Sequence, residues 1–307
     1  RDTDRSRGLG DVYKRQGFDC LGLALPIYNT ITVEETVMPG TGIEINIIDE
    51  TNEMDVLSIP TDENNIVYKA IEMLYNSIGQ TPSELKITIN TQIPVARGLG
   101  SSASVIVGGL LAANELLGRP ADEAALLSIA AEIEGHPDNS TPAILGGFVL
   151  SSLEEDGSVV YRKLNFPKDW NITVCIPDYE LATNIARSVI PDEIPIRDAL
   201  FNLKRSAMLI QAVNTADKEL MKYALQDKIH QPYREKLIPG LKEIKEALKH
   251  EENVLGVVLS GAGPSVLIIS YGNNLDKIRK TVSDVWDGLN VKSDILTLPV
   301  EETGAVI

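Results

Sequence analysis

The sequence predicts an α+β fold of two domains, one over residues 1–152 and the other over 153–307. Three observations lead to this prediction. A chain of 307 residues, 43% of them hydrophobic, is long enough to bury two cores. Residues 85–90 alternate apolar and polar side chains, as a half-buried strand does, whereas the apolar residues of 103–117 recur at helical spacing. The charged stretch LEEDGS at 153–158 is typical of a turn and marks the change of domain.

The first sixteen residues, RDTDRSRGLGDVYKRQ, differ from the rest of the chain. They lack an initiator Met and show neither strand nor helix periodicity, whereas the residues from Gly17 onward have the apolar pattern of a protein core. We therefore expect residues 1–16 to be non-native. The Gly8-Leu9-Gly10 run is not expected to bind phosphate, because no amphipathic helix follows it.

Two strands and a helix are predicted before residue 80. The strands cover 27–33 and 43–47, and Pro39 and Gly40 provide the turn between them. Apolar residues then recur at helical spacing from Ile66 to Ile78, so a helix is expected to begin at Asn64 or Asn65. Asn is a common helix cap, and this is the plain structural interpretation of Asn65.

The segment 94–118, PVARGLGSSASVIVGGLLAANELLG, joins a glycine loop to a helix directly after the strand at 85–90. The first turn of a helix has unpaired N–H groups and partial positive charge, so it attracts anions. Gly98 and Gly100 allow the backbone to approach phosphate oxygens, and Ser101 and Ser102 add hydroxyls for phosphate or magnesium. The loop lacks the GK[ST] of a Walker A motif. A tight turn with a serine cap is the alternative interpretation.

A further helix is predicted to begin at Asp122 and to end at Gly135. Glu132 and Glu134 then lie in its last turn, where the helix dipole disfavours a carboxylate by roughly 0.3–1 kcal/mol. A functional role would explain why they are there, and a solvated helix end is the alternative. The polar run HPDN at 136–139 follows directly.

The second half contains the elements of a ferredoxin-like domain, two β-α-β-like passages with antiparallel hairpins. Thr183 and Arg187 are four residues apart and would share one face of a helix. Helical patterns fill 196–250 and 275–289, and strands are predicted at 159–164, 172–176, 254–259, 266–269 and 291–298.

Composition limits the partners and the location. Acidic residues number 44 and basic residues 28, and the net charge of −16 opposes binding to nucleic acid or to anionic membranes. No apolar run reaches the roughly 20 residues of a membrane span. Cys20 and Cys175 lie in apolar surroundings, which favours buried thiols in a reducing cytoplasm over disulfides or a metal site. The three histidines share no metal-ligand spacing.

Four segments together resemble the GHMP kinases, and within that family the homoserine kinases. They are GFDCLGLALPIYN at 17–29, PVARGLGSSAS at 94–104, EIEGHPDNSTPAILGGF at 132–148 and LSGAGPSV at 259–266. The resemblance implies a ribosomal-protein-S5-like ATP-binding domain followed by a ferredoxin-like substrate domain. It also implies phosphorylation of L-homoserine by ATP with Mg²⁺, a step of threonine biosynthesis, and it allows a homodimer.

The resemblance also assigns the nucleotide and metal ligands. Glu134 would bind magnesium together with Ser102, and Glu132 is the weaker candidate. Asn65 would contact adenine. The residues expected around the triphosphate are Pro94, Arg97, Gly98, Leu99, Gly100, Ser101, Ser102 and Ala103.

For the acceptor, the resemblance assigns the ammonium group to Asp19 and the hydroxyl to Asn139. Thr183 and Gly261 would lie at the active site, and Arg187 with Arg234 would clamp the substrate carboxylate. An amide cannot accept a proton at neutral pH, so Asn139 implies catalysis by positioning and charge neutralisation. Asp138 as a base is the alternative, and His136 is expected to hold the loop.

Four alternatives remain open from the sequence. Asp19 could bond only to neighbouring backbone groups, and each arginine could form a surface ion pair. The substrate could be another small alcohol such as mevalonate, although two arginines favour a carboxylate. Finally, the substrate-binding Asn of the family falls at Tyr13, so the chain could be a nucleotide-binding protein without activity.

Overall fold

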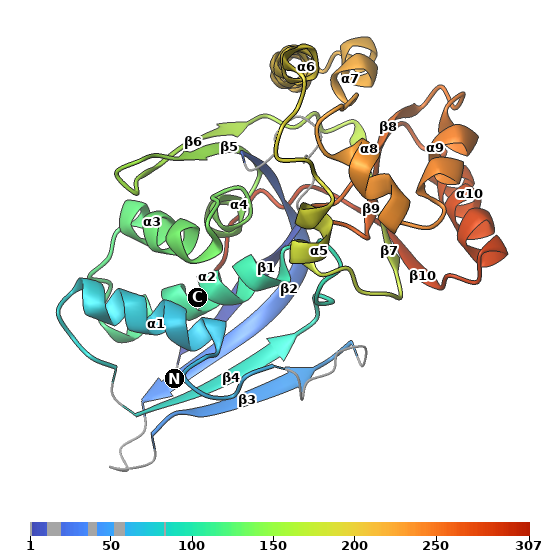
Figure 1. Cartoon of the computed structure of the whole chain (residues 1–307). Coiled ribbons are helices and arrows are strands. Elements are labelled where there is room, and N and C mark those ends of the chain that lie inside the picture. The colour runs from blue at the N-terminus through green and yellow to red at the C-terminus, as the bar shows by residue number, and fades with distance from the viewer. Residues whose placement is uncertain (1, 11–19, 36–41, 52–58, 83) are drawn as a thin grey trace.

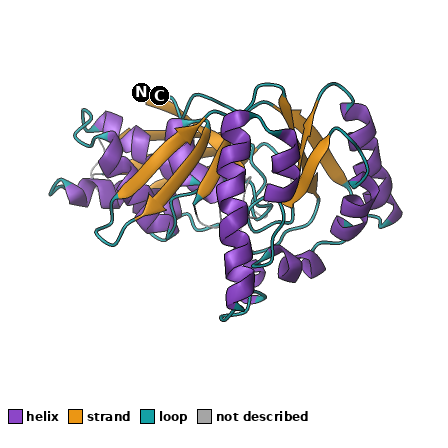
Figure 2. Ribbon diagram, turned by 90° about the horizontal axis from the view of Figure 1, so that it is seen from above, coloured by secondary structure: helices purple, strands orange, loops and turns teal. Residues whose placement is uncertain are grey.

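Two β-sheets form the framework of the protein (Figure 1). The computed structural model describes residues 2–10, 20–35, 42–51, 59–82 and 84–307. The first sheet has the strand order β3-β4-β2-β5-β6, with β1 also paired to β2, and the second has the order β10-β7-β9-β8. In Figure 2 the strands form two groups on either side of the long helix α6 (Ile196–Thr215). The predicted α+β class is confirmed.

The first sheet is built around β2, which is 15 residues long. This length lets it pair with β4 over Asn29–Glu35 and with β5 over Leu21–Leu23. The strands of this sheet are β1 (Asp2–Gly10), β2 (Leu21–Glu35), β3 (Glu44–Asp49), β4 (Leu85–Thr91), β5 (Phe148–Leu153) and β6 (Val159–Leu164).

Strand β1 differs from the expectation for the first residues, which show no strand periodicity. It pairs antiparallel with β2 from Asp2 to Gly10, with a register shift between Arg7 and Leu9. Pairing along a sheet uses backbone groups, which every residue except proline has, so a strand can form without an alternating pattern. The non-native origin of residues 1–16 remains a prediction.

Four helices accompany this sheet: α1 (Ile66–Ser77), α2 (Ser101–Leu116), α3 (Glu123–Glu134) and α4 (Ser140–Leu145). The buried faces of α1 and α2 form one core with β2 and β4, which includes Ile31, Leu74, Ile87 and Val107. Gly109 explains the close approach of the two helices. A Cβ on Gly109 would lie 2.8 Å from a methyl carbon of Val67 on α1.

The second sheet has the ferredoxin-like arrangement that the sequence predicts. Its strands are β7 (Trp170–Pro177), β8 (Val254–Leu259), β9 (Val266–Tyr271) and β10 (Ser293–Leu298). All pairs are antiparallel, and the order 4-1-3-2 with helices after the first and third strands is that of a β-α-β-β-α-β unit. The other helices are α5 (Thr183–Ser188), α7 (Lys218–Ala224), α8 (Gln231–Arg234), the 3₁₀ helix η2 (Glu235–Leu237), α9 (Leu241–Leu248) and α10 (Leu275–Gly288).

The two halves are joined more closely than a single linker would allow. Strand β6 still belongs to the first sheet, so the chain changes sheets only between Leu164 and Trp170. After the second sheet, the C-terminal residues contact the first half of the chain again. The Glu301 N–H donates to the carbonyl of Ala24 on β2, and the Ala305 N–H donates to the carbonyl of Ala143 on α4. The predicted boundary at 152/153 would divide the β5–β6 hairpin, and it remains a prediction.

Cys20 and Cys175 are not joined in a disulfide. Cys175 is fully buried on β7, and burial raises the pKa of its thiol, which disfavours the thiolate. Among the helices that the structure describes, none combines the length and the apolar character that a bilayer crossing requires.

Candidate active site

The glycine loop leads from the end of β4 at Thr91 to the start of α2 at Ser101. Gly98 and Gly100 adopt left-handed backbone angles, with φ of +75° and +70°. The chain therefore turns sharply here, and the first N–H groups of a 16-residue helix face the loop. The predicted order of strand, glycine loop and helix is confirmed.

A buried amide, Asn29 on β2, holds this loop from the side of the first sheet. Its Oδ1 accepts hydrogen bonds from the backbone N–H groups of Gln92 (3.0 Å) and Ile93 (3.2 Å). Its Nδ2 donates to the Ser104 Oγ at 2.6 Å, and the Ser104 hydroxyl donates to the carbonyl of Ser101. Sequence reasoning missed Asn29. A polar residue in the middle of a largely apolar strand was the available signal, because buried amides need partners.

The second domain holds the same loop from the opposite side. The Ser260 hydroxyl donates to the carbonyl of Gly98 at 2.6 Å, and the Ser265 N–H donates to the carbonyl of Arg97 at 3.2 Å. Contact is so close at Gly98 that a Cβ there would lie 2.2 Å from the carbonyl oxygen of Ser260. The shape of the loop therefore depends on both halves of the chain.

Glu134, at the end of α3, faces the start of α2. Its Oε1 accepts a hydrogen bond of 2.7 Å from the Ser102 hydroxyl, and its Oε2 lies 3.5 Å from the donor Nδ2 of Asn139. The negative end of α3 disfavours this carboxylate, but the positive end of α2 favours it. Glu132 is exposed on the same helix.

A cavity of about 410 Å³ brings the predicted residues together. The glycine loop lines it, and so do Glu134, His136, Asn139 and Thr183. A second, mostly apolar pocket of about 190 Å³ adjoins it and shares Ile66, Val95, Ser101 and Ser102; its other lining residues are Ile47, Ile59, Asn65, Val67, Ile89, Thr91 and Val105. Together, the cavity and the adjoining pocket can hold a ligand with an apolar end and an anionic end.

Three residues assigned to the nucleotide have other contacts. The Asn65 Oδ1 caps α1 by accepting from the Val67 N–H at 2.9 Å, and its Nδ2 donates to the carbonyl of Pro60. The Arg97 side chain lines a different cavity, beside Asp178. Ala103 is fully buried in the core. Only the backbone of Arg97 and Ala103 is thus placed to contribute to the loop.

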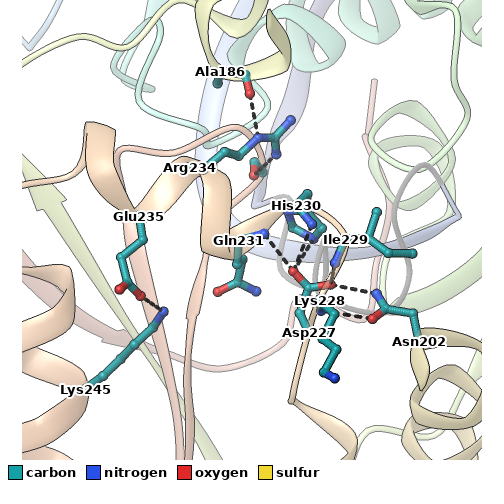
Figure 3. Close-up of polar contacts among 11 residues, drawn as sticks. Ala186, Asn202, Asp227, Lys228, Ile229, His230, Gln231, Arg234, Glu235 and Lys245 are labelled. Atoms are coloured by element: carbon teal, nitrogen blue, oxygen red, sulfur yellow. Dashed lines mark hydrogen bonds and ion pairs between the residues drawn. The ribbon is translucent and has the colours of Figure 1, made fainter. Parts of the chain in front are cut away.

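Arg234 is 1% exposed and binds two backbone carbonyls (Figure 3). Its Nε donates to Ala186 on α5 at 2.8 Å, and its Nη1 donates to Gly261 at 3.3 Å. Arg187 follows Ala186 on α5 and is half-buried. Of the described residues, those lining the 410 Å³ cavity do not include Arg187, Arg234 or Gly261. Asp19 lies outside the described residues.

The HPDN run forms a packed loop between α3 and α4. The His136 Nδ1 and the Asp138 Oδ1 are 2.6 Å apart, and the Asp138 side chain is fully buried. Gly22 on β2 lies against this loop, since a Cβ there would overlap the carbonyl oxygen of Asp138. His136 and Asp138 thus contact each other, and of the two only His136 lines the cavity.

Replacing Asn29 with Ala is expected to weaken nucleotide binding. The change leaves the N–H groups of Gln92 and Ile93 without this acceptor, which costs about 1–3 kcal/mol of folding free energy. It also releases Ser104, so we expect the KM for ATP to rise about tenfold, equivalent to about 1.4 kcal/mol. Urea denaturation and steady-state kinetics measure the two effects. Ser270→Ala, a buried hydroxyl on β9, is the control, and an unchanged KM for ATP in Asn29→Ala would contradict the prediction.

Comparison with known proteins agrees with this geometry. Residues 65–147 match the family model "GHMP kinases N terminal domain", and residues 208–288 match "GHMP kinases C terminal". A homoserine kinase of Caldicellulosiruptor saccharolyticus is 42% identical over 95% of this chain and 92% of its own, and one of Microchaete diplosiphon is 39% identical over 94% and 92%. The crystal structure of a homoserine kinase from Cytophaga hutchinsonii covers 100% of this chain and 97% of its own, with a TM-score of 0.88 and 28% identity.

Proposed function

Because the chain belongs to the GHMP kinase family, we propose that it transfers the γ-phosphoryl group of ATP to the hydroxyl of L-homoserine. The product is O-phospho-L-homoserine, a precursor of threonine. The observation that carries the proposal is the cavity shared by the glycine loop, Glu134, Asn139 and Thr183. Homoserine kinases of about 40% identity over most of the chain support the choice of substrate.

The nucleotide would lie across the two adjoining pockets. The first N–H groups of α2 and the backbone at Gly98 and Gly100 suit the phosphates, because they present donors and partial positive charge without side chains in the way. The apolar pocket beside Ile47 and Val105 suits the adenine ring. The side chain of Asn65 caps α1, and Asn65 is also one of the residues that line this pocket. We therefore propose that Asn65 contacts the adenine ring as part of the pocket lining.

The carboxylate of Glu134 and the hydroxyl of Ser102 fit a magnesium ion. Mg²⁺ in such enzymes takes one or two carboxylates, waters and substrate phosphates, and it does not need a cage of protein ligands. Within the described part of the chain, no group of three His, Cys, Asp or Glu is arranged to hold a metal. When bound, the ion would neutralise charge on the phosphates.

The acceptor would lie between Asn139 and α5. Asn139 is 6% exposed, and its amide would orient the homoserine hydroxyl toward the γ-phosphate. Arg187 and Arg234 would bind the substrate carboxylate, and Asp19 its ammonium group. Since Asn139 cannot take a proton, we propose that the hydroxyl proton passes to the phosphoryl group during transfer.

A coupled assay of ADP release tests the function. L-homoserine, D-homoserine and mevalonate serve as acceptors, with this chain and with one whose residues 1–16 are replaced by a family-like start. Turnover with L-homoserine alone supports the proposal. ATP binding without turnover in both chains would favour a non-enzyme, and turnover only after the replacement would place the defect at residues 1–16.

Replacing Arg234 with Leu is expected to raise the KM for homoserine about 10-fold to 100-fold, because a hydrogen bond to a charged group contributes about 1.5–3 kcal/mol. The KM for ATP should stay within about twofold. Arg279→Leu, which replaces a partly exposed arginine on α10, is the control. Steady-state kinetics measure both constants, and circular dichroism checks folding. Wild-type kinetics in Arg234→Leu would remove this assignment.

We also propose a cytoplasmic location, because two cysteines that are not joined in a disulfide suit a reducing compartment. A homodimer is proposed by analogy with the family alone. Sedimentation of the purified chain decides between monomer and dimer.

A further inference from the structure

A buried carboxylate, Asp227, lies just before α8 (Figure 3). Its side chain is 1% exposed. One oxygen accepts from the Ile229 N–H at 3.0 Å, and the other accepts from the N–H groups of His230 (3.1 Å) and Gln231 (2.6 Å). Three successive backbone donors therefore point at one carboxylate, which folds the chain into a tight turn.

Asn202 ties this turn to the long helix α6. Its Nδ2 donates to the Asp227 carboxylate at 2.6 Å, and its Oδ1 accepts from the Lys228 N–H at 3.0 Å. Asn202 is itself buried. A carboxylate without water needs such donors, and the donors need such an acceptor, so the arrangement tolerates little change.

The turn continues directly into α8, which spans only Gln231–Arg234. So short a helix has little stability of its own, and its start must be held by other groups. Asp227 binds the N–H of its first residue, and Arg234 is its last. One turn of backbone thus links the capping carboxylate to the guanidinium that contacts Ala186 and Gly261.

We propose that Asp227 is a positioning residue for substrate recognition. It fixes the turn that carries Arg234 against α5 and the Gly261 loop, and it touches no reacting atom itself. This inference rests on the proposed function, in which Arg234 binds the carboxylate of homoserine. Loss of the cap would let the Arg234 side chain leave its two carbonyl partners.

The variant Asp227→Asn tests the proposal. It keeps the size of the side chain but turns one acceptor oxygen into a donor that faces N–H groups. We expect the KM for homoserine to rise about tenfold, while the KM for ATP stays within about twofold. The matched control is Asp217→Asn. Asp217 caps the neighbouring helix α7 through the Leu220 N–H at 2.9 Å, and neither constant should change.

A double variant separates positioning from general damage. If Asp227 acts through Arg234, adding Asp227→Asn to Arg234→Leu should leave the KM for homoserine at the value of Arg234→Leu alone. Multiplication of the two effects would overturn the proposal. Should Asp227→Asn fail to fold, Asn202→Ala removes one donor to the Asp227 carboxylate and the acceptor of the Lys228 N–H but leaves the three backbone donors in place, so it should raise the same KM less.

Hydrogen exchange provides a measurement that needs no substrate. Amides of 183–188 and 259–263 should exchange faster in Asp227→Asn than in the unmodified chain or in Asp217→Asn. Unchanged exchange in these segments would overturn the positioning role. Failure of the unmodified chain to release ADP with L-homoserine would instead overturn the proposed function, and the exchange result would still decide the role of Asp227.

Discussion

Replacing Glu134 with Gln is expected to lower kcat about 100-fold to 1,000-fold, with little change in the KM for homoserine. The amide has nearly the same size and can still accept a hydrogen bond from Ser102, but it removes the negative charge opposite the start of α2. Loss of one preorganised electrostatic contact to a transferring phosphoryl group has an effect of about this size. The concentration of Mg²⁺ needed for half-maximal activity should rise as well.

Glu132→Gln is the matched control for this prediction. It removes the same charge from the same helix, two residues earlier in the chain, at an exposed position. The coupled ADP assay at saturating ATP and homoserine compares the two variants. If Glu134→Gln turns over like the unmodified chain, or if both variants lose the same activity, the assignment of Glu134 to the metal is wrong.

Gly98→Ala should abolish measurable ATP binding or raise the KM for ATP more than about 100-fold. At φ +75°, a side chain is strained by roughly 1–2 kcal/mol. The added Cβ would also lie 2.2 Å from the backbone oxygen of Ser260, so the loop and the second domain would have to separate. The N–H groups of the loop would then no longer converge on a phosphate.

Gly118→Ala separates the effect of backbone strain from the effect of the close contact with Ser260. Gly118 follows α2 with nearly the same backbone angle, φ +77°, but a Cβ there meets nothing within 4 Å. Both variants should therefore lose similar folding free energy from backbone strain, measured by urea denaturation. Only Gly98→Ala should lose ATP binding, measured by calorimetry. Equal ATP affinity in the two variants would contradict the role of the loop.

Local patterns in the chain were sufficient to locate the elements around the site. The alternation before Thr91 indicated β4, the apolar spacing after Ala103 indicated α2, and Gly98 and Gly100 indicated the turn between them. Asn65 also caps its helix as its residue type predicts. The expected class of two-domain fold and the resemblance to the GHMP kinases are confirmed, because they depend on such short, continuous signals.

Long-range contacts could not be read from these patterns. The hydrogen bond from Ser260 to Gly98 joins residues 162 positions apart, and Asn29 reaches Ser104 over 75 positions. Likewise, Arg97 belongs to the glycine loop in sequence, but its side chain lines another cavity. Which way a side chain points depends on what packs against it.

The order of residues along the chain was thus enough to locate β4, α1, α2 and α3, the Asn65 cap and the glycine turn before α2, because backbone periodicity and capping act within a few residues. Only the tertiary structure showed that Ser260 holds Gly98, that the C-terminal residues return to the first domain, and that Asp227 and Asn202 support the turn before Arg234. Buried polar groups must find partners wherever packing places them, and those partners come from distant parts of the chain.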